Sequence, residues 1–356
     1  MSALANSKND SVRVTKSAGA VFEPGKPSVE GPAPGEIVIK NVAVASNPKD
    51  WKMAKMMGYE GIEGNDVAGH VAAVGDGVTE FKEGDKVGAF TVMATADKYG
   101  AYQRYSHTPA HTAFHIGSNT SYEQAATLPL AVLTAAIGLF AKDKLALQEP
   151  TAQAKPASSE TAKQIVVVWG ASSSVGAFVT QLAKLAGYHV IGVASGSKDY
   201  ARQLGADDIV DYKTEKAIPQ ALLTVAGGRP IVAAYDAISE HGSTQDLVSL
   251  FEKQGEAQKG RLTTVLPTQY DQDKSGLPNH VYFDRTFVGA AHKDQSDFSS
   301  RWIRQISKWV DEGTFKPNRV EIVSGGLKGV PEGLAKLESG KVSGVKLVYR
   351  IEETPA

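Results

Sequence analysis

A run of small residues, Gly-Ala-Ser-Ser-Ser-Val-Gly at positions 170–176, is the clearest indication of chemistry in this chain. Small side chains after a strand let the backbone approach a pyrophosphate closely, and the amide groups at the start of the next helix can donate to it. Aligned from its last glycine, a G-x-G-x-x-G pattern falls on Ala171, Ser173 and Gly176. The turn therefore predicts nucleotide binding, and a phosphate-free strand–helix crossover with a Ser-rich turn is the alternative.

The turn must be held between two strands and at the start of a helix. Residues 165–169 form a continuous apolar run, as expected of a strand that is covered on both faces, and residues 189–194 are expected to form the second strand. Between them, apolar residues recur at helical spacing as far as a stop at Gly187. This strand–helix–strand unit predicts five diphosphate contacts: Ala171, Ser172, Ser173, Ser174 and Val175.

The residues that follow the second strand favour NADPH over NADH. An NAD site usually carries an acidic residue there, which binds the ribose 2′-hydroxyl. This chain has Ala194 and Ser195 instead. Ser195 and Lys198, with Tyr212 further along, offer donors and a positive charge that suit a 2′-phosphate. Asp199 lies close enough to keep NADH open as the alternative.

Composition excludes several classes of function. At 356 residues, the chain is long enough for two domains, and a net charge of −1 predicts no nucleic-acid partner. The absence of cysteine excludes disulfides, thiolate catalysis and Cys-ligated zinc. The longest apolar run, 128–140, is too short to span a membrane, and the first residues lack a signal-peptide core. These features predict a cytoplasmic enzyme with a small-molecule substrate and no membrane contact.

The remaining pattern predicts an α/β chain of two architectures. Short strands separated by turns, up to about residue 125, indicate a small barrel-like β domain. Strands that alternate with helices after that point indicate a doubly wound parallel sheet. A helix is expected over 123–140 with a bend near Pro129, and the later elements are expected as strands at 209–212, 231–238, 261–266, 282–290 and 345–351 and helices at 302–310 and 330–339.

The order of these motifs resembles the medium-chain dehydrogenase/reductase superfamily over nearly the whole length. The resemblance implies a GroES-like β-barrel catalytic domain over 1–125, a Rossmann dinucleotide-binding domain over 126–290, and a return to the catalytic domain over 291–356. The segments that carry the resemblance are Asn47–Lys52, Gly64–Val78, Phe81–Val87, Leu128–Ala135, 166–176, Leu204–Tyr212 and Gly340–Val348.

Within that superfamily, the chain is similar to the zinc-free quinone oxidoreductases and enoyl reductases, including fungal members that carry NPxDWK. Zinc-dependent members have a Cys near the Asn47–Asp50 turn and Gly-His-Glu where this chain has Gly64, Asn65 and Asp66. The resemblance implies an NADPH-dependent reductase, without a metal site, that acts on an activated C=C bond or a quinone. It leaves open an aldehyde reductase, a trans-acting enoyl reductase of a polyketide synthase, a non-catalytic NADPH-binding protein, and either a homodimer or a monomer.

The resemblance also implies roles for individual residues in an interdomain cleft. Lys52 would hold the substrate oxygen, with a surface lysine as the alternative. Thr134 would donate a hydrogen bond, Asn47 would orient substrate or ribose, and Pro48 would lie beside the cofactor. The proton donor stays open between solvent and Tyr59, Tyr102 or His292. Further cofactor contacts are implied at Leu266, Pro267, Ala291, His292 and Lys346.

Overall fold

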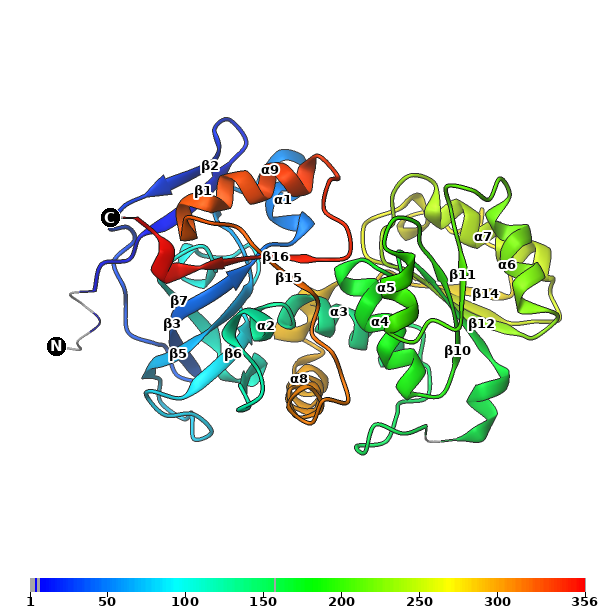
Figure 1. Ribbon diagram of the computed structural model, residues 1–356, viewed down its shortest axis with the longest axis horizontal. Coiled ribbons are helices and arrows are strands. Elements are labelled where there is room, and N and C mark those ends of the chain that lie inside the picture. The colour runs from blue at the N-terminus through cyan, green and yellow to red at the C-terminus, as the bar shows by residue number, and fades with distance from the viewer. Residues whose placement is uncertain (1–3, 5–6, 157, 356) are drawn as a thin grey trace. The chain divides into compact units, whose positions relative to one another are not determined.

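The computed structural model of the chain describes residues 4, 7–156 and 158–355. The chain forms two compact units: unit 1 is Met1–Leu130 with Gly289–Ala356, and unit 2 is Ala131–Val288 (Figure 1). The sequence had placed these divisions at 125/126 and 290/291. Within the described residues, no helix combines the length and the apolar character that crossing a bilayer requires.

Unit 2 is built on a six-stranded parallel sheet. Its strand order, β11-β10-β9-β12-β13-β14, is the order of a Rossmann fold, in which the ligand crevice lies where the chain changes direction between β9 and β12. The central strand β9 is buried along its whole length, which explains its continuous apolar sequence. The strands are β9 (Ile165–Trp169), β10 (His189–Val193), β11 (Asp208–Val210), β12 (Ile231–Asp236), β13 (Gly260–Thr264) and β14 (Val281–Phe283).

The helices of unit 2 lie against this sheet (Figure 1). α4 follows β9 directly, and its buried face includes Phe178, Val179 and Leu182 at helical spacing, as the sequence predicted. The strand–helix–strand unit is therefore confirmed. The helices are α3 (Pro129–Phe140), which begins at the end of unit 1, α4 (Ser174–Leu185), α5 (Lys198–Gln203), α6 (Ile218–Ala226) and α7 (Ser243–Gln254).

Two predicted elements differ from the structure. The helix expected over 123–140 is two helices, α2 (Tyr122–Ala126) and α3, because a proline is tolerated in the first turn of a helix and not in its interior. The strand expected over 282–290 ends at Phe283, and a 3₁₀ helix occupies Val288–His292. The strand is short because the chain leaves the sheet here and returns to unit 1 at Gly289.

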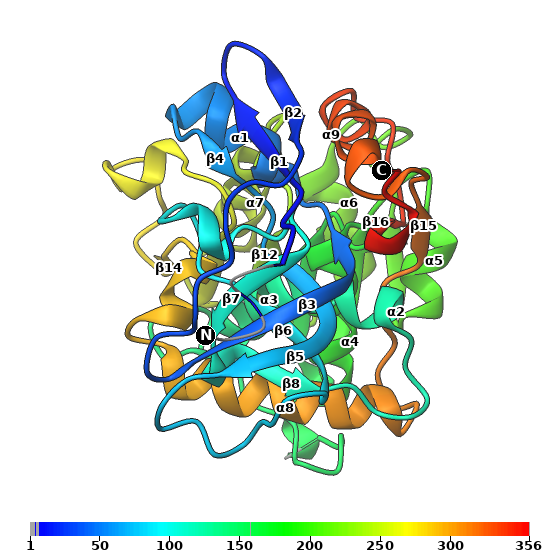
Figure 2. The same cartoon turned by 90° about the vertical axis from the view of Figure 1, so that its left-hand side faces the viewer.

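Unit 1 combines a seven-stranded sheet with a three-stranded sheet in the order β2-β1-β4. The long strand β3 lies at the centre of the larger sheet and pairs antiparallel with β5, β7 and β16. Figure 2 shows β3, β5, β6 and β8 side by side. The strands are β1 (Ser11–Thr15), β2 (Gly19–Glu23), β3 (Glu36–Ala45), β4 (Gly61–Ile62), β5 (Asp66–Val74), β6 (Lys86–Phe90), β7 (Tyr105–Pro109), β8 (Ala113–His115), β15 (Val320–Ile322) and β16 (Lys346–Arg350).

The helices of unit 1 cover its sheets, and the last part of the chain supplies two of them. The helices predicted over 302–310 and 330–339 are present, and so is the final strand, β16. Two residues separate the end of β3 from the start of α1, so the residues of its first turn lie beside the sheet. The helices are α1 (Pro48–Met57), α2, α8 (Ser296–Asp311) and α9 (Val330–Glu338).

Candidate active site

The small-residue turn of unit 2 has the shape of a phosphate cradle. Gly170 has a φ of 74°, in the left-handed region, and turns the chain from β9 toward α4. Ser173 caps α4, with its Oγ 3.1 Å from the Gly176 amide nitrogen. A Cβ on Gly176 would lie 2.1 Å from the Gly170 carbonyl oxygen, so a side chain here would push the helix off the strand.

The five predicted diphosphate contacts all lie at this turn. Ala171 is buried against the sheet, whereas Ser172, Ser173, Ser174 and Val175 are partly exposed. The first amides of a helix lack intrahelical acceptors, and the helix dipole adds positive potential at the same end. The turn therefore fits an anionic diphosphate in both shape and charge.

The structure also places an ion pair, Lys198–Asp211, after the ends of β10 and β11, and the sequence had not indicated Asp211. Asp211 follows β11, and Lys198 Nζ lies 3.0 Å from its Oδ2. The hydrogen bond from Lys198, joined by donation from the Lys213 amide and from Ser195, lowers the pKa of Asp211 to about 2. The structure thus brings Ser195 and Lys198 together, with the lysine already paired, and Tyr212 is exposed next to them.

The other predicted residues of unit 2 do not join this cluster. Thr134 is buried in α3, and its carbonyl oxygen accepts a hydrogen bond of 2.8 Å from Tyr235 Oη. Leu266 follows β13 and is partly exposed, and Pro267 is exposed. The Leu266 carbonyl accepts a 3.2 Å hydrogen bond from Thr264 Oγ1, which tightens the turn at the strand end.

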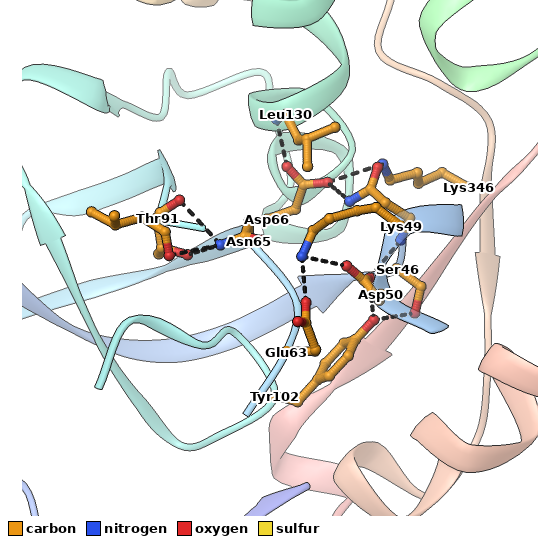
Figure 3. Close-up of polar contacts among 12 residues, drawn as sticks. Ser46, Lys49, Asp50, Glu63, Asn65, Asp66, Thr91, Tyr102, Leu130 and Lys346 are labelled. Carbon is orange, nitrogen blue, oxygen red and sulfur yellow. Dashed lines mark hydrogen bonds and ion pairs between the residues drawn. The ribbon is translucent and has the colours of Figure 1, made fainter. Parts of the chain in front are cut away.

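Unit 1 holds a buried network around Asp66 at the start of β5 (Figure 3). Asn47 Nδ2 donates to Asp66 Oδ2 over 2.7 Å, and Lys346 Nζ lies 2.9 Å from the same oxygen. Lys346 also donates to Asn47 Oδ1 over 2.5 Å, and the Leu130 amide donates to Asp66 Oδ1 over 2.6 Å. Asp66 is fully buried, and Lys346 is 2% exposed.

This network changes the interpretation of two predicted residues. The side-chain amide of Asn47 makes hydrogen bonds through both its nitrogen and its oxygen. These bonds hold Asp66 and Lys346 in place. Both observed interactions of the Lys346 ammonium are made inside unit 1. Pro48 begins α1 directly after Asn47, where a proline is favoured.

A second buried network lies beside the first and includes Glu63, a residue that the sequence did not indicate. Lys49 Nζ lies 2.9 Å from Asp50 Oδ1 and 2.5 Å from Glu63 Oε2 (Figure 3). Asp50 Oδ2 accepts hydrogen bonds from Tyr102 Oη over 2.5 Å and from the Asn47 amide over 2.7 Å. The Tyr102 hydroxyl also lies 2.8 Å from Ser46 Oγ.

Burial shifts the pKa values of the three side chains that were candidates for the proton donor: Tyr59, Tyr102 and His292. Burial raises the pKa of Tyr102 well above its usual value, and burial also raises that of Tyr59. His292 stacks on Phe90 at 4.9 Å and lies edge-on to His111 at 5.5 Å. Burial lowers the pKa of His292 to about 4, so it is a neutral imidazole near pH 7 and does not act there as an imidazolium acid. The preceding residue, Ala291, accepts a hydrogen bond from His111.

Lys52 lies on α1, three residues beyond Lys49. Its side chain is partly exposed, and Nζ lies 5.5 Å from the centre of the Trp51 ring. At the position where zinc-dependent members carry His, Asn65 Nδ2 donates to Thr91 Oγ1 over 3.0 Å. In the part of the chain that the structure describes, no three His, Cys, Asp or Glu side chains group as a metal site would require.

Comparison with known proteins connects both units to one group of enzymes. Residues 33–132 match the family described as alcohol dehydrogenase GroES-like domain, and residues 174–259 match the family described as zinc-binding dehydrogenase. The trans-enoyl reductase fsr4 of Gibberella fujikuroi is 31% identical over 304 residues, which cover 83% of this chain and 86% of that protein.

Solved structures share the fold across almost the full length. An alcohol dehydrogenase superfamily protein from Novosphingobium aromaticivorans has a TM-score of 0.76 at 22% identity, covering 96% of this chain and 99% of that one. The quinone oxidoreductase of Escherichia coli, solved as a complex with NADPH, has a TM-score of 0.71 at 20% identity, covering 95% and 99%. At these identities, the likeness establishes the fold.

The buried ion pair of Lys346 predicts a large effect on stability. Replacing Lys346 with methionine leaves the Asp66 carboxylate buried without its cation, so we expect a loss of about 3–5 kcal/mol in the free energy of unfolding. Chemical denaturation measures this loss. The matched control is Lys336→Met, because Lys336 pairs with Glu321 at the surface, where both side chains are 37% exposed. That change should cost about 0–1 kcal/mol, and equal losses in the two variants would contradict the assignment of a buried pair.

Proposed function

This chain belongs to the medium-chain dehydrogenase/reductase superfamily, and from that premise we propose that it is an NADPH-dependent reductase that works without zinc. Its substrate is an enone, an enoyl compound or a quinone. The observation that carries the proposal is the cradle at 170–176, because it fits a diphosphate and opens the helix of a Rossmann unit. The relatives named trans-enoyl reductases support C=C reduction over reduction of a simple aldehyde.

The residues of unit 2 bind and select the cofactor in this proposal. The amides at the start of α4 hold the diphosphate, and the nicotinamide supplies the hydride when the cofactor is bound. Ser195 and Lys198 bind the 2′-phosphate, while Asp211 holds the Lys198 ammonium in position. The chain has Ala194 and Ser195 where NAD sites usually carry an acid, so no carboxylate at that position opposes the phosphate.

The residues of unit 1 act on the substrate. Lys52 donates from its ammonium to the substrate oxygen, which gains negative charge as the carbon accepts hydride, and so it stabilises that charge. The buried networks of Asn47 and Asp50 hold the first turn of α1, the helix that carries Lys52. Because His292 is neutral near pH 7, we assign protonation of the resulting enolate to solvent.

Turnover with a panel of substrates tests this function. We expect the purified protein to consume NADPH with enones and quinones faster than with simple aldehydes, and the conjugated absorbance of the enone should disappear in step with NADPH. Aldehydes reduced faster than enones would assign the carbonyl reaction instead. Tight NADPH binding without turnover on any substrate would make the protein a non-catalytic binder.

Replacing Lys52 with alanine tests the electrostatic role. Loss of a donor to the developing oxyanion should lower kcat by about 10²–10³-fold, while the unfolding transition stays in place. Lys55→Ala is the matched control, because Lys55 lies one turn along the same helix and its Nζ is 5.9 Å from the same Trp51 ring. Equal kcat values for the Lys52 variant and the wild type would remove Lys52 from the mechanism.

Replacing Lys198 with alanine tests the choice of cofactor. A charge-assisted hydrogen bond of about 1.5–3 kcal/mol would be lost, so NADPH should bind about tenfold to 100-fold more weakly, and NADH affinity should stay nearly constant. Isothermal titration with each cofactor measures both constants. Lys184→Ala, which removes a lysine from the surface pair with Asp207 in the same unit, should affect neither. A parallel loss for NADH and NADPH would count against the 2′-phosphate contact.

A further inference from the structure

Glu63 is a buried carboxyl whose two oxygens have different surroundings. The residue is 2% exposed. Its Oε2 accepts a hydrogen bond of 2.5 Å from Lys49, whereas its Oε1 is buried and has no hydrogen-bond partner among the described residues. When a buried carboxyl oxygen has no donor, the ionised form is disfavoured more than the neutral form, because a charge loses more hydration free energy on burial than a neutral carboxyl does. The geometry at Oε1 therefore favours a proton there.

The neighbouring carboxyl, Asp50, also has one buried oxygen, Oδ1, without a hydrogen-bond partner among the described residues, but its Oδ2 receives two donors. It lies at the third position of α1 and accepts from the Asn47 amide and from Tyr102, and it faces the Lys49 ammonium at 2.9 Å. Two hydrogen-bond donors and one ammonium therefore surround this carboxyl. In the ionised state of Glu63, one ammonium would face two buried carboxylates, so the cluster would carry a net charge of −1.

The other charged and titratable groups around Glu63 do not cancel this net negative charge. The Tyr102 amide donates to the Glu63 carbonyl over 3.1 Å, which places this tyrosine against it, but the Tyr102 hydroxyl donates to Asp50. Tyr59, between α1 and β4, experiences the charge of Glu63 and also that of the Asp97–Arg13 ion pair. That arginine is bound to Asp97 and to Glu23, and both tyrosines are neutral near pH 7.

We propose that Glu63 is a proton-storing group whose Oε1 carries an exchangeable proton, and that its charge state regulates the electrostatic potential along α1. As the pH rises, the O–H bond at Oε1 breaks, the proton passes to water, and the cluster gains one negative charge. Lys52 lies on the same helix, so the added charge opposes the negative charge that develops on the substrate oxygen. This second step rests on the proposed function, whereas proton storage does not.

The direction of the pKa agrees with this geometry. Burial raises the pKa of Glu63, and Asp50 raises it further, while Lys49 and the Gly64 amide act in the opposite direction and do not cancel the rise. A carboxyl with a raised pKa in the folded state stabilises the fold below the pKa of the unfolded chain, at about pH 4.3. That contribution is lost as the pH rises through the folded pKa.

Glu63→Gln is the test variant, since it keeps the shape and removes the ionisation. Glu36→Gln is the matched control: Glu36 is a buried glutamate of the same unit that binds Tyr99, Lys98 and the Ala33 amide, and these donors lower its pKa. The free energy of unfolding is measured by denaturant between pH 4 and pH 9 for both variants and the wild type. Infrared spectra over the same range follow the carbonyl stretch of a protonated carboxyl.

We expect the stability of Glu63→Gln relative to the wild type to rise with pH, and that of Glu36→Gln to fall relative to the wild type. A carboxylic-acid band should persist in the wild type above pH 5, disappear on further titration, and be absent from Glu63→Gln alone. A wild type without such a band, or a band unchanged in Glu63→Gln, overturns proton storage. The wild-type titration requires no variant to fold, so the proposal stays testable if Glu63→Gln is unstable.

The pH dependence of kcat tests the regulation of α1. In the wild type, kcat should fall with the midpoint at which the infrared band disappears, and in Glu63→Gln this fall should be absent. A kcat profile that is identical in the two proteins overturns the regulatory step. If no protein turns over any substrate, the proposed function fails, and the infrared and stability measurements still decide whether Glu63 stores a proton.

Discussion

The start of α1 depends on two buried carboxylates, and the arrangement of unit 1 around its candidate substrate residues follows from them. Asp50 accepts the Asn47 amide, which closes the first turn of the helix. Asp66 accepts the Asn47 side chain, so the residue before the helix is held to β5 as well. Each carboxylate faces a lysine, because a buried negative charge is stable only when it is paired and receives several hydrogen bonds.

The two networks differ in their charge balance. This difference separates the network that supports the start of α1 from the one that we propose regulates the electrostatic potential along α1. The Asp66 network contains one carboxylate and one ammonium, and a neutral amide joins them. The two opposite charges of this network balance. The network of Lys49 has a second carboxylate, Glu63, and only one ammonium. A buried carboxyl without a cation of its own favours its protonated form, because burial and the neighbouring carboxylate both disfavour a second negative charge.

Unit 2 uses a different physical device. Its cradle is made from backbone groups and small residues, and the close approach of α4 to β9 at Gly176 leaves no room for a Cβ. Asp211 then holds the Lys198 ammonium at the neighbouring strand ends. In the proposed function, backbone amides supply affinity for the diphosphate, and side chains at the strand ends supply the choice between cofactors. In that proposal, affinity and selectivity depend on different parts of the unit.

The sequence by itself determined the features that depend on neighbouring residues. Periodicity located β9, α4 and β10, small residues marked the turn at 170–176, and motif order indicated both domain types. It could not show that Lys49 would pair with Glu63, or that Lys346 would reach Asp66, because the partners of a buried charge are chosen by tertiary packing across distant elements. Tertiary structure also explains why β14 is shorter than expected. The strand ends because the chain returns to unit 1, and not because of local propensity. Tertiary structure alone decided which ionisable side chains are buried together, because burial sets the energetic penalty of every charge and removes the water that would otherwise satisfy it.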